Sequence, residues 1–408
     1  MADYRHGRSL STKRMFELVV ANPPNAWLTT DMTASQTQRV AVIGSAQTEL
    51  RAAHHDSQHI DLIAEAVTQA LLGTGLRIDD VDFVIDSGSD FLDGRSISNC
   101  GFLGSMGADM KEESRVEEDG LWALTYATSK LLGGTGSVGL VVAYSKSSES
   151  DPRDFWSTLA EPFTQRPVGL DHRSVAGLYA QRYLAAYKRS LADLAVVRDH
   201  SWSRAARRGG NDVAAQDLAN ASWSEIVASP LTRRDMARPV DGAVAVLVAT
   251  EHVARQLGRE SVWITGMGSA IDQHFIAARE PASLPAAQAA TKSALRMAKI
   301  DDVKQLDVFE LSADSTVGEL MMVEAIGLTQ EGHGVEAYVG PLADRINRSG
   351  GSLPASPVMA TGLVRLHEVV SELTGRSNSA DGEARSGLAH GTGGLGMQNH
   401  CVVTLERS

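Results

Sequence analysis

The stretch HIDLIAEAVTQALLGTGLRIDDVDFVIDS, residues 59–87, recurs in outline as LPAAQAATKSALRMAKIDDVKQLDVFELS, residues 284–312. Both copies predict an amphipathic helix, an acidic turn and a short apolar strand that ends in serine. Each follows an apolar segment with a glycine turn, at 39–47 (RVAVIGSAQ) and 261–270 (SVWITGMGSA). A block that recurs once, more than 200 residues later, indicates two similar α/β halves, because a solenoid needs at least three short repeats.

The ends of the two repeated strands indicate where a ligand binds. In an open α/β sheet, ligands bind beyond the carboxyl ends of the strands. We therefore expect Ser87 and Ser312, with their neighbours, to lie at one shared site.

Length and composition limit the possible classes of protein. A chain of 408 residues that is 43% apolar can bury a large core and form two domain-sized units. Its net charge of −12 argues against a nucleic-acid-binding protein, which would have a basic surface. A local basic cluster is interpreted as a solvated helix face, or alternatively as a docking surface for a phosphate-bearing cofactor. Its members are Arg198, Arg204, Arg207 and Arg208.

The two cysteines, Cys100 and Cys401, provide neither a disulfide framework nor a metal-ligand spacing. This usage is typical of the reducing cytoplasm, where we expect the protein to be located. No apolar run approaches the length of a membrane span. Residues 1–38 lack a convincing signal peptide, and we interpret them as an extension that packs on a neighbouring subunit or is disordered.

Strands and helices alternate along the rest of the chain, which predicts the α/β class with a mainly parallel sheet in each half. The predicted organisation is an extension (1–38), an N-terminal half (39–255) and a C-terminal half (256–408). Within the first half, residues of about 145–230 form an insertion that covers the site. The main predicted strands are 39–44, 81–86, 138–144, 306–311 and 399–406, and the main predicted helices are 59–74, 116–133, 174–188, 191–208, 213–221, 316–326 and 357–374.

Four motifs give the chain a resemblance to the thiolase superfamily. NRSGGSLPASPVMATGL (347–363) resembles the signature NPxGGxxxxGHPxGATG, and GLAHGTGGLGMQ (387–398) resembles the C-terminal glycine-rich loop. DVFELSADSTVGELMMVEAIGL (307–328) is similar to a strand and helix of the sterol-carrier and lipid-transfer thiolases. Residues 117–149 are similar to the segment that carries the nucleophilic cysteine. The motifs follow the family's order and separations from residue 39 onward.

The resemblance implies a duplicated thiolase fold, with helices packed between the sheets of two similar halves. It also implies a homodimer, a coenzyme A thioester as substrate and no separate cofactor or metal. The glycine turns would contribute to substrate binding through Gly350, Gly351, Gly391, Gly393 and Gly394.

This chain has different residues at the positions of the family's catalytic residues. Glu117 stands at the position of the acylated cysteine, Ser312 at that of the usual asparagine or histidine, and Ser356 at that of the Gly-His-Pro histidine. The second cysteine aligns with Gly391, beside His390. A thiolase forms its acyl-enzyme on a cysteine thiolate, whereas an acylated glutamate would be a readily hydrolysed mixed anhydride. The usual ping-pong acyl transfer is therefore not expected.

Three functions remain open. The first is retro-aldol cleavage of a β-hydroxyacyl-CoA side chain, of a steroid or another bulky lipid, by a member that resembles the cysteine-less steroid side-chain aldolases. The resemblance implies that such a member acts with a small zinc-ribbon and OB-fold partner. The second is a catalytically silent subunit that supports an active partner, and the third is an acyltransferase or Claisen enzyme with a relocated nucleophile.

The retro-aldol reaction needs a general acid/base and an oxyanion hole. The acid/base candidates are Glu117, Asp119, Asp314 and His390, and the oxyanion candidates are Ser312, Ser356 and the backbone N–H groups of 391–394. Purely structural roles remain open for several of them. Glu117 with Glu118, and Asp314 with Ser315, could serve only in helix capping, and His390 could be a satisfied core histidine. The aromatic residues between 155 and 187 form either core or a lipid-binding wall.

Overall fold

The computed structural model describes residues 39–94, 97–209, 211–212, 221–258, 260–377 and 384–408. The predicted extension 1–38 lies outside these residues, as does the predicted helix 213–221 apart from its last residue. Among the described residues, none of the helices is both long and apolar enough to cross a membrane.

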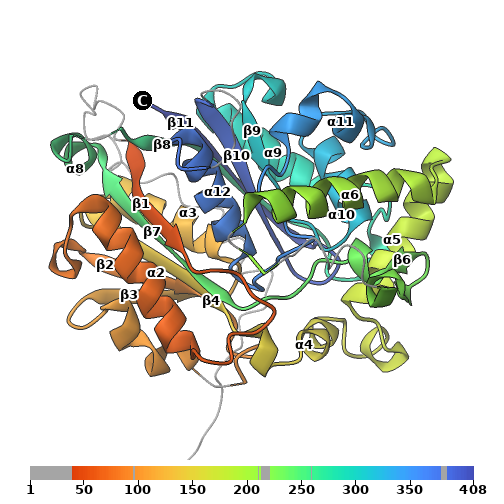
Figure 1. Cartoon of the computed structure of the whole chain (residues 1–408), viewed down its shortest axis with the longest axis horizontal. Coiled ribbons are helices and arrows are strands. Elements are labelled where there is room, and N and C mark those ends of the chain that lie inside the picture. The colour runs from red at the N-terminus through yellow and green to blue at the C-terminus, as the bar shows by residue number, and fades with distance from the viewer. Residues whose placement is uncertain (1–38, 95–96, 210, 213–220, 259, 378–383) are drawn as a thin grey trace, which may run out of the picture. The chain divides into compact units, whose positions relative to one another are not determined.

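The duplication predicted from the repeat is visible in the strand order. The main sheet runs β3-β2-β4-β7-β1-β8-β11-β10-β9, so the order β2-β4-β7-β1 in the first half is matched by β9-β10-β11-β8 in the second (Figure 1). The two halves meet where β1 pairs with β8. The strands are β1 (Val40–Gln47), β2 (Phe83–Ser87), β3 (Glu112–Val116), β4 (Val138–Ser145), β7 (Gly242–Thr250), β8 (Val262–Ile271), β9 (Val308–Glu310), β10 (Ser386–Gly393) and β11 (Asn399–Arg407).

The sheet is mixed, and the pairing repeats between the halves. The parallel pairing expected from the sequence is found where β2 meets β4 and β3, and where β9 meets β10. Strands β7 and β1 pair antiparallel with their neighbours, as do β11 and β8. β10 and β11 are antiparallel because a short turn joins them directly, whereas a parallel pair needs a long crossover.

Corresponding helices cover the outer face of each half. Helix α2 (His59–Thr74) packs on β1 and β7, and α9 (Pro285–Ala298) packs on β8 and β11. The glycines predicted to form turns lie within strands instead, where the helix backbone comes close. A Cβ added to Gly268 would lie 2.1 Å from the Ala290 carbonyl oxygen, and one added to Gly44 would lie 3.0 Å from the Ala70 carbonyl oxygen.

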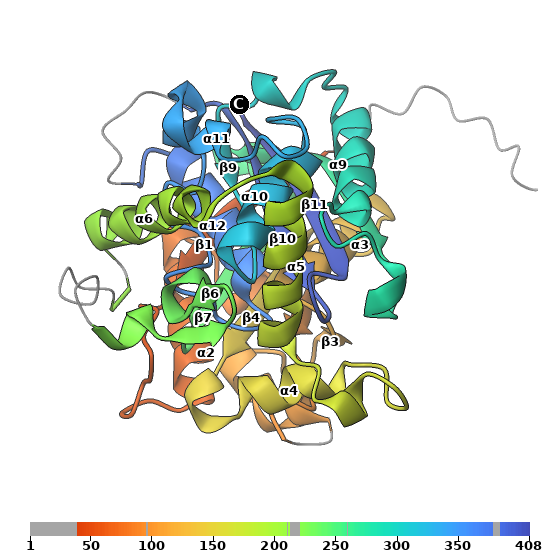
Figure 2. The ribbon, with the colours of Figure 1, turned by 90° about the vertical axis from the view of Figure 1, so that its right-hand side faces the viewer.

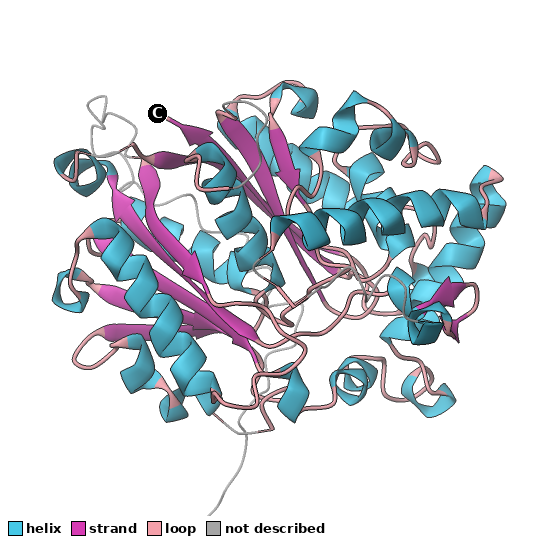
Figure 3. Ribbon diagram, viewed as in Figure 1, coloured by secondary structure: helices cyan, strands magenta, loops and turns pink. Residues whose placement is uncertain are grey.

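Two helices occupy the space between the halves, as the resemblance implied. Helix α3 (Gly120–Leu132) and helix α12 (Thr361–Leu373) each contact strands of both halves and also contact each other (Figure 3). Both begin four residues later than predicted. Their N-termini lie side by side, since a Cβ on Gly120 would lie 2.8 Å from the Leu363 Cβ.

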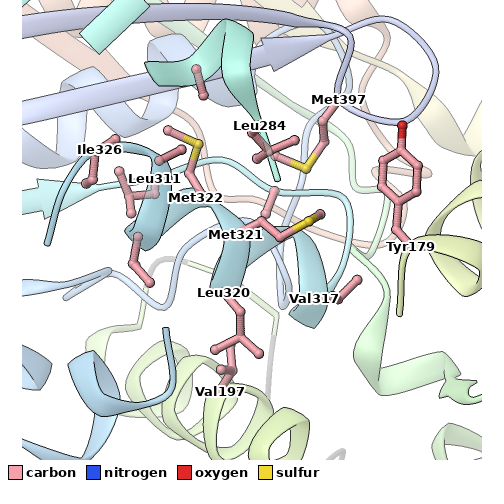
Figure 4. Close-up of a cluster of buried hydrophobic side chains, with 14 of the residues drawn as sticks. Tyr179, Val197, Leu284, Leu311, Val317, Leu320, Met321, Met322, Ile326 and Met397 are labelled. Carbon is pink, nitrogen blue, oxygen red and sulfur yellow. The ribbon is translucent and has the colours of Figure 1, made fainter. Parts of the chain in front are cut away.

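The predicted insertion forms a helical layer at one side of the sheet (Figure 2). It contains α4 (Pro152–Thr158), α5 (His172–Tyr187), α6 (Leu191–Arg208) and the hairpin β5 (Ile226–Ala228) and β6 (Leu231–Thr232). Beneath α5 and α6 lies α10 (Thr316–Ala325), all of whose residues are buried. Figure 4 shows its side chains pointing in several directions, with Leu320 toward Val197 of α6. A helix that is buried on every side belongs to the core of a large protein.

The arginine cluster on α6 is largely neutralised within the protein. Arg198, Arg204 and Arg208 form ion pairs with Asp235, Asp344 and Glu368 respectively. Their charge is therefore committed to internal carboxylates, which argues against the alternative of a phosphate-docking surface.

Candidate active site

A pocket of about 720 Å³, including its open mouth, lies where the inner helices begin and the glycine turns meet. It lies beneath the helical layer of the insertion. Its walls come from both halves and from the insertion. The lining residues are Asp119, Trp156, His172, Ala237, Pro239, Ser312, Ala313, Asp314, Ser356, Val358, Met359, Thr361, Thr392, Gly393, Gly394, Gly396 and Met397.

Asp119 links the N-termini of the two inner helices. It is the N-cap of α3, and its Oδ1 accepts a hydrogen bond from the Leu121 N–H at 3.0 Å. Its Oδ2 accepts from the Gly362 N–H in the first turn of α12, at 2.9 Å. The carboxyl group is buried, and this burial raises its pKa to about 7 despite the two N–H donors. Asp119 therefore fixes the floor of the pocket as well as lining it.

Asp314 follows β9 and has one oxygen available to a ligand. Its Oδ1 accepts a hydrogen bond from the Ser315 hydroxyl at 2.8 Å, whereas its Oδ2 is buried and has no partner among the described residues. The helix cap is provided by Ser315, whose Oγ accepts from the Gly318 N–H. The capping role expected of Asp314 and Ser315 is thus confirmed for Ser315, and Asp314 does not provide the cap. Burial raises the pKa of Asp314 to about 6.

Ser312 lies beside Asp314 at the end of the second repeat strand. Its hydroxyl is buried and also has no partner among the described residues. Ser356 lines the same pocket, with its hydroxyl 3.1 Å from that of Thr361. A buried polar group without a partner is costly, so the free Ser312 hydroxyl and Asp314 oxygen indicate a ligand-binding role.

Ser87, from the first repeat strand, lies immediately behind this pocket. Its hydroxyl donates to the carbonyl oxygens of Glu118, at 2.5 Å, and Met359, at 3.3 Å. The two repeat strands thus converge as the sequence predicted. Of the two serines, Ser312 lines the pocket and Ser87 does not, because the Ser87 hydroxyl is hydrogen-bonded to backbone carbonyl groups behind it.

Glu117 does not point into this pocket. Its Oε1 accepts from the Asp90 N–H at 2.7 Å, and its Oε2 lies 3.3 Å from Arg115. Its half-exposed side chain lines a neighbouring hollow. The alignment with the family's cysteine fixed its backbone position, but the side chain turns toward Arg115, whose charge attracts it.

We expect Glu117→Gln to keep turnover within about threefold of the wild type, since no proton transfer at the pocket depends on this carboxyl group. The rate of ketone release from a β-hydroxyacyl-CoA checks this expectation. A loss of a hundredfold would place Glu117 in the reaction.

His390 lies in β10, not in a loop, and is outside the pocket lining. Its Nδ1 accepts from the Ser312 N–H at 3.3 Å, so its Nε2 carries the proton and donates to the His400 Nδ1 at 3.0 Å. Burial, with His400 beside it, lowers the pKa of His390 well below its usual value. His390 therefore positions Ser312 from behind and is unavailable as a base in the pocket. The glycine-rich segment reads as a loop, yet most of it pairs as strand because glycine fits the tight packing against α3 and α12.

The glycines predicted to bind substrate divide into two groups. Gly393 and Gly394 line the pocket. Gly391 lies behind Asp119, where a Cβ would come 2.9 Å from its Oδ1. Gly350 packs against α6, and Gly351 packs against Asn347. The Asn-x-x-Gly-Gly turn thus supports the fold of this region and does not line the pocket.

The sequence analysis missed His172, at the start of α5. It lines the pocket, and its Nδ1 is buried without a partner among the described residues. Burial, with Arg173 beside it, lowers the pKa of His172 to about 4, so the ring is neutral at pH 7. A histidine at a helix start within the covering insertion was the only sequence signal for it.

Two methionines of the lining, Met359 and Met397, adopt left-handed backbone conformations, with φ of 70° and 53°. Such conformations cost about 1–3 kcal/mol in a non-glycine residue and occur preferentially at functional sites. Among the described residues, no group of three His, Cys, Asp or Glu side chains is placed to hold a metal ion.

Comparisons with known proteins agree with this fold. A family model described as thiolase C-terminal domain-like matches residues 268–407. The acetyl-CoA acetyltransferase of Methanothermobacter thermautotrophicus is 25% identical over 380 residues, covering 88% of this chain and 97% of that protein. Sterol carrier protein 2 of Oryctolagus cuniculus is 29% identical over 190 residues, which cover 41% of this chain and 32% of that protein.

Two solved structures share the fold. An Ltp2-ChsH2(DUF35) aldolase aligns with a TM-score of 0.72 and 19% identity, over 90% of this chain and 97% of that chain. Human mitochondrial 3-ketoacyl-CoA thiolase aligns with a TM-score of 0.70 and 15% identity, over 92% of this chain and 100% of that chain. This chain belongs to the thiolase superfamily.

In this member of the thiolase superfamily, neither cysteine lines the pocket. Cys401 is buried in β11, and burial raises the pKa of its thiol well above the usual value. Cys100 is exposed elsewhere on the chain. The groups that face the pocket are carboxyl, hydroxyl and imidazole, which suit proton transfer better than thioester exchange.

Proposed function

We propose that this chain cleaves a β-hydroxyacyl-CoA by a cysteine-independent retro-aldol reaction. One observation carries the proposal. The same pocket contains a carboxyl oxygen of Asp314 and a hydroxyl of Ser312 that both lack a hydrogen-bond partner among the described residues. Similarity to an aldolase fold and to sterol carrier protein 2 supports it.

The reaction balances with these groups alone. Asp314 removes the proton of the β-hydroxyl, the oxygen forms a carbonyl, and the bond between Cα and Cβ breaks. The electron pair moves into the thioester enolate, whose oxygen receives hydrogen bonds from Ser312 and Ser356. Protonated Asp314 then returns the proton to Cα, and a ketone and a shortened acyl-CoA leave. General-base catalysis and oxyanion stabilisation each suit a site with water largely excluded.

The thioester arm would enter through a basic mouth that adjoins the pocket. This mouth shares His172, Ala237 and Pro239 with the pocket. Four arginines line it, namely Arg153, Arg173, Arg233 and Arg238. Arg153, Arg233 and Arg238 form ion pairs with Asp171, Glu225 and Asp212, so Arg173 is the arginine whose charge is not already paired with a carboxylate among the described residues. Trp223 lies beside them and offers a flat face to an adenine ring. Arginines bind phosphate well because their donors form a fork.

Acyl transfer through a relocated serine is less well supported, although a relative is an acetyl-CoA acetyltransferase. A serine nucleophile needs an adjacent base to take its proton. The nearest histidine to Ser312, His390, uses Nδ1 for the Ser312 backbone N–H and Nε2 for His400. It therefore has no lone pair for the Ser312 hydroxyl.

We also propose a partner subunit, since the similar aldolase is named as a pair of components, Ltp2 and ChsH2(DUF35). A small zinc-ribbon and OB-fold protein is the expected partner. The test is incubation of the chain, with and without such a co-purifying partner, with bulky β-hydroxyacyl-CoA thioesters while ketone release is followed. Absence of turnover under both conditions would instead support a catalytically silent subunit.

A homodimer through the β3 edge of the sheet is proposed as well. β3 ends the strand order, and exposed apolar side chains gather near it, with Met110 fully exposed and Tyr126 and Leu132 on α3. An unpaired strand edge readily pairs with another chain. We expect sedimentation to give a dimer and the double change Met110→Asp, Tyr126→Asp to give a monomer. Phe163→Asp, on an exposed position elsewhere, is the control, and a monomeric wild type would contradict the proposal.

A further inference from the structure

A second hollow adjoins the central pocket, as the basic mouth does. This aromatic hollow, defined by Phe91, Phe155, Trp156, Leu159 and Met359, shares Trp156, Met359 and Gly394 with the pocket. Charged side chains also border it, namely Glu117, Glu118 and Arg166. The basic mouth shares a different set, His172, Ala237 and Pro239. The pocket is thus bordered by two openings whose chemistry differs.

A row of rings leads from the surface to the pocket through the aromatic hollow. The exposed ring of Phe91 lies 6.3 Å from that of Phe155, which lies 5.0 Å from Trp156, and Trp156 lies 6.2 Å from His172. Phe91 is 59% exposed although it belongs to this row. The three ring pairs are tilted, and aromatic side chains at these separations suit a flat apolar ligand.

Met359 separates the hollow from the pocket. Its left-handed conformation is held by its carbonyl oxygen, which accepts hydrogen bonds from the Gly120 N–H at 2.8 Å and the Ser87 hydroxyl at 3.3 Å. The side chain therefore lines both spaces from a backbone that is fixed by the start of α3.

We infer that the aromatic hollow holds the bulky apolar fragment of the substrate, the part released as a ketone, while the thioester arm occupies the opposite, basic mouth. The inference rests on the proposed function and adds where each fragment lies. It follows that the two products leave by different openings and can be bound at the same time.

The test uses prodan, a neutral flat naphthyl ketone whose fluorescence shifts when it leaves water, together with free coenzyme A. We expect the full chain to bind prodan saturably, with or without saturating coenzyme A. Phe91→Ala should weaken prodan binding roughly 5- to 10-fold because one ring contact is lost. Leu159→Arg, which replaces an apolar side chain of the hollow with a long charged one, should weaken it more strongly.

Two variants serve as controls. Phe163→Ala removes an exposed phenylalanine of the same insertion that lines none of these spaces, and should leave prodan binding unchanged. Arg173→Glu should weaken coenzyme A binding and leave prodan binding unchanged. The inference is overturned if the wild type does not bind prodan, if Phe91→Ala and Leu159→Arg bind it as the wild type does, or if coenzyme A displaces it. Because these are binding measurements, a chain that binds both probes but cleaves no substrate would refute the reaction alone.

Discussion

Asp314→Asn is expected to lower kcat/KM for ketone release by about 10²- to 10⁴-fold, the usual contribution of a positioned general base. The amide keeps the shape of the carboxyl group, and its oxygen can still accept from the Ser315 hydroxyl. The lost function is the ability of Oδ2 to take a proton. Steady-state assays with a bulky β-hydroxyacyl-CoA check the change.

The pH dependence tests the same assignment. With the pKa of Asp314 raised to about 6, the base form increases as the pH rises through that value. Wild-type kcat/KM should therefore rise across this range, and Asp314→Asn should lack that limb. Glu117→Gln, which changes a carboxyl group outside the pocket, should keep it. An Asp314→Asn enzyme with full activity would remove Asp314 from the reaction.

Asp119→Ala is expected to lower the free energy of unfolding by about 2–5 kcal/mol, since it leaves two buried backbone donors unsatisfied. These donors are the N–H groups of Leu121 and Gly362, which no other acceptor reaches among the described residues. Urea denaturation at pH 7 measures the change, and we also expect activity to fall because both inner helices lose their tie at the pocket floor.

Asp151→Ala provides a matched control for this effect. Asp151 is likewise an N-cap, accepting from the N–H groups of Arg153 and Asp154, but it lies at the exposed start of α4. Water can replace the lost acceptor there, so the expected cost is about 1 kcal/mol. Equal losses for the two variants would show that Asp119 caps α3 without linking the two helices.

Local sequence patterns were sufficient for most of the elements. The helix predicted at 59–74 has the observed bounds, as does the one at 191–208, because an apolar face with a helical period and a capping residue are read directly from neighbouring residues. The repeat identified the duplication because each half must bury the same faces. The glycine-rich 387–393 was misread because one of its pairing partners, β9, is distant in sequence.

Local sequence patterns predicted only part of the candidate site. Strand ends placed Ser312 and Asp314 at the pocket, since the topology of an α/β sheet fixes where strands terminate. Which way a side chain turns depends on partners brought by folding. Arg115 attracts the Glu117 side chain away from the pocket. The Ser312 N–H donates to Nδ1 of His390, so that nitrogen is not available to a substrate. The insertion places His172 and Trp156 in the pocket lining.

The sequence by itself determined that this chain is a duplicated α/β protein of the thiolase superfamily without the family's usual nucleophile. The hydrophobic period of the helices and strands, the order of the motifs and the residue at each position can all be read from the chain without its fold. Only the tertiary structure decided which polar groups are left free to act. Asp119 and Asp314 both carry buried carboxyl oxygens beside a helix start. Backbone N–H groups donate to both oxygens of Asp119, whereas Oδ2 of Asp314 has no partner in the part of the chain that the structure describes. That difference arises from contacts between segments hundreds of residues apart.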